Sequence, residues 1–449
     1  MTTDIIRSDL EAISTITLTF LAWRSIQYIL VFFTPPNQFD TSTELTIEYI
    51  LSSAPNSDSI VKSWNTFWNR RLWNKLLSWD AVFFIKGMTV DDHVPRYEHE
   101  YAFSPVWVKL VRYYSRGSTN LFTVLKTGVL LENLLFYFSA ILLYFLTIGI
   151  FSRNNPRSEY ARNVARGAVK IFIFSSVSGF VTGIYSEPLS FALTFFGMLL
   201  REKSIEILIP FNINCVWSRW PLYLLSSICF SFAAVNRSNC ILLGIYYIFD
   251  LLQLIKFKRN LKALCFPLLS GGLMFTVCCY YLYFMPFTEY CPERGEWCDT
   301  QVLSTLPFTK VTFYSFIQSH YWNIGFLKYW TLNNTPNFLI ALPNIVILLY
   351  STFYFSKIYP TFTLRPLIWI TRALVLLLLL FAHVQIINRV ASFIPLHLWY
   401  IADRSMKSRM KKNDDALLGD DMIVKVYLYW LICWVPLQTV LFACFLPPA

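Results

Sequence analysis

The chain has 449 residues, of which 55% are hydrophobic and only 14% charged, whereas water-soluble domains carry about 25% charged residues. Repeated apolar runs of roughly 17–25 residues therefore predict an all-α polytopic membrane protein with about 8–11 spans. The formal net charge of +11 does not predict a nucleic-acid partner. Its basic residues cluster in short connections between apolar runs, where they set the orientation of the spans.

The first apolar run, residues 13–33, is expected to remain as an anchor, since no small-residue cleavage site follows it. A long polar stretch, residues 34–125, comes next and begins with prolines that end the helix. Within it, residues 63–86 place tryptophan and aliphatic side chains at helical spacing, with basic residues between them. This pattern predicts an amphipathic helix in the membrane interface; the alternative is a helix packed on the protein's own surface.

The later apolar runs alternate with polar or basic connections, and no separable soluble domain interrupts residues 1–449. The runs cover residues 127–151, 171–185, 189–200, 221–235, a run ending at 254, 263–285, 338–354, 367–381, 385–400 and 422–446. Ser186, Glu187 and Pro188 separate the two shortest runs. This separation is typical of a turn at the membrane face or of discontinuous helices that line a cavity.

Charge placement predicts the orientation of the spans. With the N-terminus in the cytosol, every strongly basic connection lies there too, as the positive-inside rule requires. The two long polar loops, residues 34–125 and 286–337, then face the lumen. Cys291 and Cys298 share the second loop, which predicts a disulfide in an oxidising compartment. Zinc is the weaker alternative, because no second cysteine pair or histidine cluster accompanies these two.

Asp80 is a candidate catalytic residue in the first loop. It follows Trp79 directly and precedes two phenylalanines. A carboxylate among aromatic side chains near a membrane surface suits general-base chemistry. A helix-capping role is the structural alternative for the same residue.

Tyr97, Glu98 and His99 form a second candidate group in the same loop. Two adjacent titratable side chains in an aromatic setting are able to orient a substrate or contact a phosphate. The alternative is a solvated pair without a role in chemistry.

Arg237 and Asn239 lie between two apolar runs, away from the basic connections. An arginine at membrane depth is costly and is a functional candidate for that reason, and its planar fork suits a phosphate. A helix-end arginine whose head group reaches the interface is the alternative. Glu187 supports the same argument more weakly.

Several familiar signatures are absent from the sequence. It contains no phosphate-binding loop, no dinucleotide-binding glycine pattern and no zinc-protease helix. It also lacks the Asp-x-Asp motif that holds a divalent metal for a nucleotide-sugar. If the protein transfers a sugar, we expect neither a metal nor a nucleotide-sugar donor.

Motifs along nearly the whole chain resemble those of the GPI mannosyltransferase 2 family, the PIG-V type. The matching segments are Trp79-Asp80-Ala81, Tyr97-Glu98-His99 with Ala102-Phe103 and Pro105, Tyr185-Ser186-Glu187-Pro188, Arg237-Ser238-Asn239, Tyr321-Trp322-Asn323 through Trp330, Pro336-Asn337-Phe338, His383-Val384-Gln385 and the terminal residues 445–449. Two departures are Phe83, where the family often has His, and Ser104, where it often has a second Phe.

The resemblance implies a GT-C fold, a multi-helix membrane bundle with its active site at the lumenal face of the endoplasmic reticulum. The implied reaction adds the second mannose of the GPI precursor through an α-1,6 bond. Dolichyl-phosphate mannose is the donor, and no cofactor is needed. Because the donor is β-linked and the product α-linked, a single displacement inverts the anomeric carbon. Such a displacement requires a base and groups that stabilise the leaving phosphate.

In this interpretation Asp80 is the base and Glu98 the reserve candidate. His99 and Arg237 are assigned to the phosphate. The other expected substrate contacts are Trp79, Tyr97, Glu187, Asn239 and Trp322.

Two rival functions remain open from the sequence. One is another GT-C mannosyltransferase, and the other is a non-catalytic transporter of lipid-linked sugars. A transporter is expected to distribute polar residues along symmetric mid-span helices, whereas here they concentrate in the first loop. The expected partners are the two lipid substrates and the membrane of the endoplasmic reticulum, with room for an accessory membrane subunit.

Overall fold

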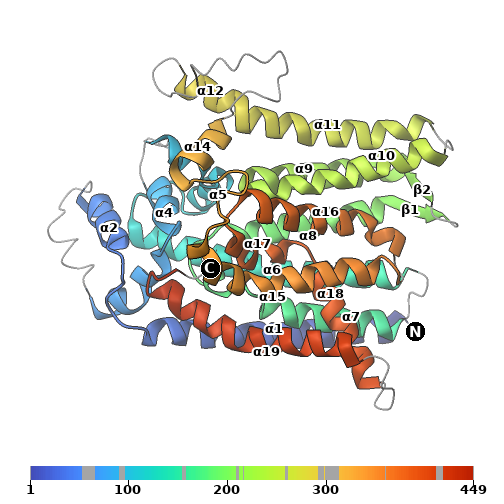
Figure 1. Ribbon diagram of the computed structural model, residues 1–449, viewed down its shortest axis with the longest axis horizontal. Coiled ribbons are helices and arrows are strands. Elements are labelled where there is room, and N and C mark those ends of the chain that lie inside the picture. The colour runs from blue at the N-terminus through green and yellow to red at the C-terminus, as the bar shows by residue number, and fades with distance from the viewer. Residues whose placement is uncertain are drawn as a thin grey trace.

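The computed structural model describes residues 2–52, 66–89, 97–153, 158–208, 212–215, 217–257, 261–291, 298, 313–358, 361–410 and 418–447. Helices make up almost all of this described part and run side by side in a bundle (Figure 1). Its one sheet is a two-stranded antiparallel hairpin, in which β1 (Ile205–Leu208) pairs with β2 (Asn212–Cys215). The predicted all-α class is therefore confirmed.

Seven helical segments of the described chain are long and apolar enough to cross a membrane. They contain α1 (Thr2–Phe33), α6 (Leu121–Phe151), α10 (Ile245–Phe257), α11 (Cys265–Cys279) with α12 (Met285–Tyr290), α15 (Thr335–Phe355), α16 (Thr361–Phe381) and α19 (Leu418–Ala443). The sequence predicts about 8–11 spans. The difference arises because the run 171–185 is mostly irregular beyond the end of α7 (Glu159–Ile173), α9 (Trp220–Asn236) is short, and α8 (Glu187–Ser204) has charged residues at both ends.

The apolar stretch before residue 187 is a broken helix. Helix α7 ends at Ile173, an irregular segment follows, and α8 begins at Glu187 with Pro188 in its first turn. The chain between the two helices is irregular apart from a short 3₁₀ turn (Ser178–Val181). Irregular backbone in a membrane protein is tolerated when its polar groups are satisfied by the protein. Here the amide of Gly179 donates to Gln438 Oε1 at 2.9 Å, and Ser178 Oγ accepts from Gln27 Nε2 at 2.6 Å.

The predicted span over residues 385–400 is wrong. The chain there is divided into α17 (Ile387–Val390), a 3₁₀ turn and α18 (Leu396–Met410). Pro395 explains the break, because a proline disfavours helical geometry in the residue before it, and Ile394 is extended with φ −102° and ψ 113°. Apolar composition alone does not distinguish a buried broken segment from a continuous span.

The amphipathic helix expected over residues 63–86 is also broken. A π turn (Asn69–Trp73) and a 3₁₀ turn (Asn74–Leu77) precede α4 (Ala81–Thr89). Trp79, which lies between the 3₁₀ turn and α4, has a positive φ of 60°. Leu76 and Leu77 are buried, whereas Phe67 and Trp68 are more than half exposed. The segment therefore packs on the protein at one end and presents aromatic side chains outward at the other.

Lys75 fixes this segment to the end of the first helix. Its buried ammonium donates to the carbonyl oxygen of Thr34 at 2.8 Å, and it also contacts the carbonyl of Pro35. Burial lowers the pKa of Lys75 to about 8. The chain is thus held firmly just before it turns into Trp79 and Asp80.

The elements of the two long polar loops gather at one end of the bundle, and the N-terminus and the hairpin lie at the other (Figure 1). The loop elements are α2 (Ser42–Ser52), α4, the 3₁₀ turn Glu98–Ala102, α5 (Pro105–Tyr114), α12 and α14 (Phe313–Trp322). A disulfide joins Cys291 and Cys298 in the second loop. Residues 53–65, 90–96, 292–297 and 299–312 of these loops lie outside the described part.

Candidate active site

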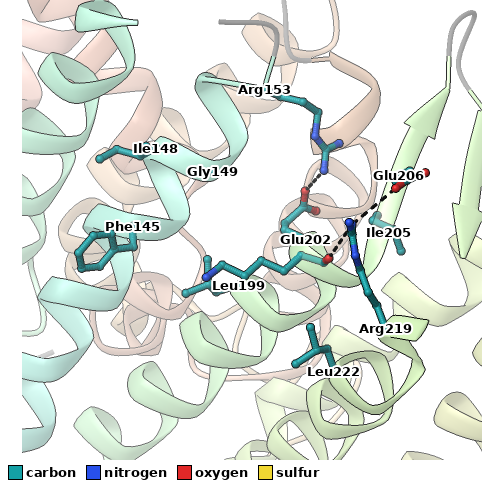
Figure 2. Close-up of a pocket in the computed structure, with 11 residues that line it drawn as sticks. Phe145, Ile148, Gly149, Arg153, Leu199, Glu202, Ile205, Glu206, Arg219 and Leu222 are labelled. Atoms are coloured by element: carbon teal, nitrogen blue, oxygen red, sulfur yellow. Dashed lines mark hydrogen bonds and ion pairs between the residues drawn. The ribbon is translucent and has the colours of Figure 1, made fainter. Parts of the chain in front are cut away.

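Two of the cavities in the described structure have arginines in their walls and lie at opposite ends of the bundle. The larger, of about 1020 Å³, lies near the hairpin, at the end that holds the N-terminus (Figure 2). Each of its two arginines is paired with a glutamate: Arg153 Nη2 lies 2.9 Å from Glu202 Oε2, and Arg219 Nη1 lies 3.6 Å from Glu206 Oε1. The smaller, of about 240 Å³, lies at the end of the polar loops.

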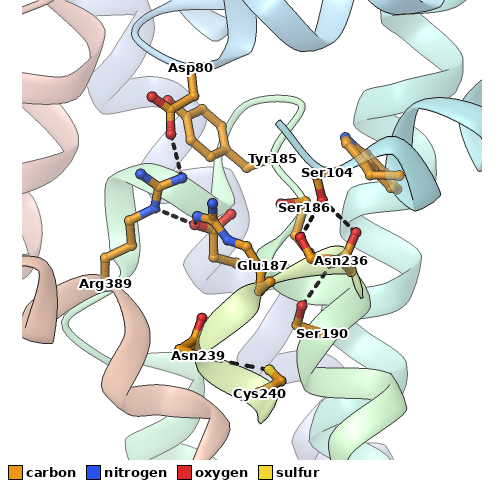
Figure 3. A network of polar contacts seen from close by, with 12 residues as sticks. Asp80, Ser104, Tyr185, Ser186, Glu187, Ser190, Asn236, Asn239, Cys240 and Arg389 are labelled. Atoms are coloured by element: carbon orange, nitrogen blue, oxygen red, sulfur yellow. Dashed lines mark hydrogen bonds and ion pairs between the residues drawn. The ribbon is translucent and has the colours of Figure 1, made fainter. Parts of the chain in front are cut away.

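The smaller cavity adjoins a chain of four charged side chains (Figure 3). Asp80 Oδ2 forms an ion pair with Arg389 Nη2, with the two atoms 2.7 Å apart. Arg389 Nε donates to Glu187 Oε1, and Arg237 Nη2 donates to the same oxygen. Two carboxylates thus balance two guanidinium groups. Arg237 and Arg389 also line the cavity itself.

Each member of this chain, which we call the charged cluster, stands where a helix begins or ends. Asp80 directly precedes α4, and Glu187 is the first residue of α8. Arg237 directly follows α9, and Arg389 lies in the four-residue helix α17. The helix breaks described above are therefore what brings the four side chains together.

Asp80 is held at a strained turn. The positive φ of Trp79 is uncommon for a bulky residue, and such strain persists only where neighbouring contacts fix it. One such contact is Tyr185, whose buried hydroxyl donates to the carbonyl of Ser78 at 3.0 Å. The Tyr185 ring also lies 5.0 Å from the guanidinium carbon of Arg389, so one side chain supports both partners of the ion pair.

Hydrogen bonds fix the cavity wall next to Arg237. The hydroxyl of Ser104 donates to Asn236 Oδ1 at 2.6 Å. The Asn236 amide in turn donates to the carbonyl of Ser186 at 2.8 Å and to Ser190 Oγ at 2.7 Å. Loop 34–125, the start of α8 and the end of α9 are joined in this way. Ser104, one of the two departures from the family pattern, is thus a hydrogen-bonding residue of the site.

Glu98 and His99 belong to a separate aromatic group. Glu98 Oε1 accepts from the hydroxyl of Tyr321 at 2.9 Å. The His99 ring lies 5.8 Å from Tyr97, 4.9 Å from Tyr321 and 5.7 Å from Phe83, measured between ring centroids. Burial lowers the pKa of His99, which favours the neutral imidazole at pH 7.

Phe83 connects this aromatic group to the charged cluster. It lies one turn after Asp80 on α4 and stacks on Phe103 with ring centroids 4.4 Å apart. The ring of Trp322 meets Phe103 edge-on at 5.7 Å. Asp80 and Glu98 therefore occupy neighbouring groups with different partners.

Two other predicted substrate contacts have partners within the protein. Trp79 stacks on Phe445, near the C-terminus, with ring centroids 5.2 Å apart. Asn239 lines the small cavity, and its amide lies 3.8 Å from the sulfur of Cys240.

Sequence reasoning missed Arg389, the residue that bridges Asp80 and Glu187. The signal was present, because a single arginine stands inside the apolar run 385–400. The argument that singled out Arg237, the cost of a charge at membrane depth, applies equally to this position. Within the described residues, no group of three or more His, Cys, Asp or Glu side chains is arranged to hold a metal ion.

Comparison with known proteins decides the family. A family model described as mannosyltransferase (PIG-V) matches residues 13–449. The chain belongs to the PIG-V mannosyltransferase family. The resemblance found in the motifs is thereby confirmed, and the protein is a membrane-embedded glycosyltransferase.

Individual members of the PIG-V family match over nearly their full length. A protein named GPI mannosyltransferase 2 from Saccharomyces cerevisiae is 53% identical over 436 residues, which cover 97% of this chain and 99% of that protein. One of the same name from Candida glabrata is 47% identical over 437 residues, covering 96% and 98%. A third, from Candida albicans, is 33% identical over 438 residues, covering 96% and 98%.

The motifs that carry the PIG-V resemblance meet in the charged cluster. Asp80, Glu187 and Arg237 come from three motifs that are far apart in the sequence. Arg389 follows the His383-Val384-Gln385 motif by four residues. A polar arrangement built from so many separate motifs is the strongest candidate for the active site of this mannosyltransferase.

Proposed function

We propose that the protein transfers mannose from dolichyl-phosphate mannose to the GPI precursor, as its second mannose and in α-1,6 linkage. The names of the relatives support the acceptor. The observation that carries the mechanism is the pair of Asp80 and Arg389, whose charged atoms lie 2.7 Å apart, with Arg389 in the wall of a small cavity. A base and a phosphate-binding cation stand side by side there, as a displacement at a phosphate-linked sugar requires.

Asp80 acts as the base in this proposal. As the 6-hydroxyl oxygen of the acceptor mannose attacks the anomeric carbon, its proton passes to the Asp80 carboxylate. The bond from that carbon to the phosphate oxygen breaks at the same time, and dolichyl phosphate leaves with the bonding electron pair. The Asp80 side chain is 24% exposed, so one carboxylate face is open to a hydroxyl while the other meets Arg389.

Arg389 and Arg237 stabilise the leaving phosphate. Both line the cavity, and planar guanidinium groups bind phosphate through paired hydrogen bonds. Glu187 is only 3% exposed and contacts both arginines, so we assign it to holding them in position rather than to meeting the substrate. His99, whose lowered pKa favours the neutral form, is suited to donate a hydrogen bond rather than a charge.

Glu98 is better suited to the acceptor than to the role of base. It is hydrogen-bonded to Tyr321 within the aromatic group, and Tyr97 and Trp322 lie close by. Aromatic faces and a carboxylate together are typical of a site that holds a sugar ring. The Trp79 ring is stacked on Phe445, so its contribution is to the shape of the turn that carries Asp80.

We further propose that the polar loops face the lumen of the endoplasmic reticulum and that the N-terminus lies in the cytosol. The gathering of both loops at one end of the bundle and the basic connections between the spans support this orientation (Figure 1).

The test of the proposed function is depletion of the protein, followed by identification of the GPI intermediate that accumulates. A precursor with a single mannose is the expected species, and re-expression of the wild-type chain should clear it. An unchanged precursor pool would refute the proposal. Accumulation of a longer or a mannose-free precursor would assign the protein to another step.

A further inference from the structure

An apolar groove of about 460 Å³ lies beside the cavity of the charged cluster. Its walls come from α5, α9, α11 and the π turn Tyr280–Phe284. Aliphatic and aromatic side chains form these walls, and Lys109 is the single charged residue among the described residues that line it. Phe232 and Tyr280 are about half exposed, so the groove opens on the outer, membrane-facing surface of the bundle.

The groove and the cavity share part of their walls. Pro105, Val235 and Tyr281 line both of them. Val235 lies two residues before Arg237, and Pro105 follows Ser104, which is hydrogen-bonded to Asn236. A continuous path of apolar and then charged surface therefore leads from the membrane to the guanidinium groups.

Such a path has the polarity of a lipid phosphate. The cavity offers two cations to an anionic group, and the adjoining groove offers close packing contacts to a hydrocarbon chain that stays within the membrane.

We propose that the groove binds the isoprenoid chain of the donor, in the segment next to the phosphate. The inference rests on the proposed function, because it takes the donor to be a polyisoprenyl phosphate sugar. In that donor the chain is bonded directly to the phosphate. In a glycosylphosphatidylinositol acceptor, the inositol and its phosphate lie between the sugars and the lipid, so the lipid is remote from the reacting mannose. A chain that leaves the cavity beside Arg237 therefore belongs to the donor.

A tryptophan placed in the groove tests this assignment. Val277→Trp fills the groove from α11, and Val106→Trp fills it from α5. The matched control is Leu269→Trp, which adds the same ring on α11 at a 68% exposed position outside the groove. The full-length protein in nanodiscs is assayed with mannosyl phosphate donors that carry a long polyisoprenyl chain or a ten-carbon chain.

We expect both groove variants to raise the KM for the long-chain donor by about tenfold, because the added ring removes packing contacts of the chain with the groove walls. The KM for the short-chain donor should rise as well, because its ten carbons occupy the same segment next to the phosphate. The KM for the acceptor and the kcat should change little, and the control should behave as wild type. A raised KM for the acceptor with an unchanged KM for the donor would overturn the inference. So would unaltered kinetics in groove variants that elute and melt like wild type.

Photolabelling distinguishes failure of this inference from failure of the proposed function. The probe is a polyisoprenyl phosphate without mannose that carries a diazirine near the phosphate. Labelled peptides from α5, α9 or α11 support the groove, even if the wild-type protein transfers no mannose from either donor. Labelling confined to other helices contradicts it, even if transfer is normal.

Discussion

Two arginine–carboxylate clusters, one at each end of the bundle, differ in whether their buried polar atoms all have hydrogen-bond partners. Near the hairpin, Arg201 Nε donates to Asp250 Oδ2 at 2.9 Å, and the Tyr223 hydroxyl donates to the same oxygen at 2.7 Å. Both charged side chains of that pair are almost fully buried. In the charged cluster of the active site, Glu187 Oε2 and Arg237 Nε are buried and have no hydrogen-bond partner among the described residues.

This difference distinguishes a cluster that stabilises the fold from one that is available to bind a ligand. A buried ion pair with its hydrogen bonds satisfied holds helices together, and here it joins α8, α9 and α10. A cluster with spare hydrogen-bonding capacity beside a cavity is prepared for a ligand. Cavity size does not make this distinction, since the larger cavity lies at the end where the arginines are already paired (Figure 2).

The largest effect is expected when Arg389 loses its charge. Arg389→Gln should lower kcat by about 10²–10³-fold, the range found when a preorganised group that stabilises developing charge is removed. The measurement is the initial rate of mannose transfer at matched protein abundance. Arg153→Gln, which breaks an arginine–glutamate pair in the larger cavity, is the control and should leave the rate nearly unchanged. Equal losses of transfer rate in the two variants would contradict the distinction between the charged cluster and the larger cavity.

The opposite result is expected for Asp250. Asp250→Asn leaves the buried guanidinium of Arg201 without its main countercharge. Loss of one partner of a buried ion pair typically lowers the free energy of unfolding by about 3–5 kcal/mol. Thermal unfolding in detergent should show this loss, while kcat per folded molecule should stay close to wild type. A variant that keeps its unfolding temperature but loses kcat would move the Asp250 cluster into the active site.

A smaller effect is expected when His99 is replaced, and it concerns how the stability of the protein depends on pH. The pKa of His99 in the folded protein lies below the unfolded value of about 6.5, so the unfolded chain binds the proton more readily. The stabilisation is fully present above about pH 6.5 and is lost as the pH falls through the folded pKa. His99→Gln should therefore weaken the drop in unfolding temperature between pH 7 and pH 5. An identical drop in variant and wild type would show that His99 titrates normally.

Much of the fold and part of the site were predictable from the sequence. Length and polarity of the apolar runs indicated the membrane bundle, and the cost of buried charge indicated Glu187 and Arg237. The breaks at Ile173 and Pro395 were harder to predict, because buried irregular segments are as apolar as spans. Arg389 was not predicted because it lies inside one such apolar run, residues 385–400.

Long-range contacts set the other limit to prediction. Trp79 was expected to stack on a sugar, yet its ring partner is Phe445, more than three hundred residues later in the chain. Similarly, sequence reasoning placed Asp80 and Glu98 in one loop as rivals for one role. The structure gives them different partners, Arg389 and Tyr321, which local sequence does not reveal.

The assignment of the base is the central claim, and paired isosteric variants test it most directly. Asp80→Asn and Glu98→Gln keep the size of each side chain and remove its basic oxygen. The measurement is mannose transfer from dolichyl-phosphate mannose in membranes that carry each variant at matched abundance. A positioned base contributes about 10²–10⁴-fold, so Asp80→Asn should lose that factor in kcat, and Glu98→Gln should lose less, mainly through a higher KM for the acceptor. Near-normal turnover by Asp80→Asn beside an inactive Glu98→Gln would contradict the account.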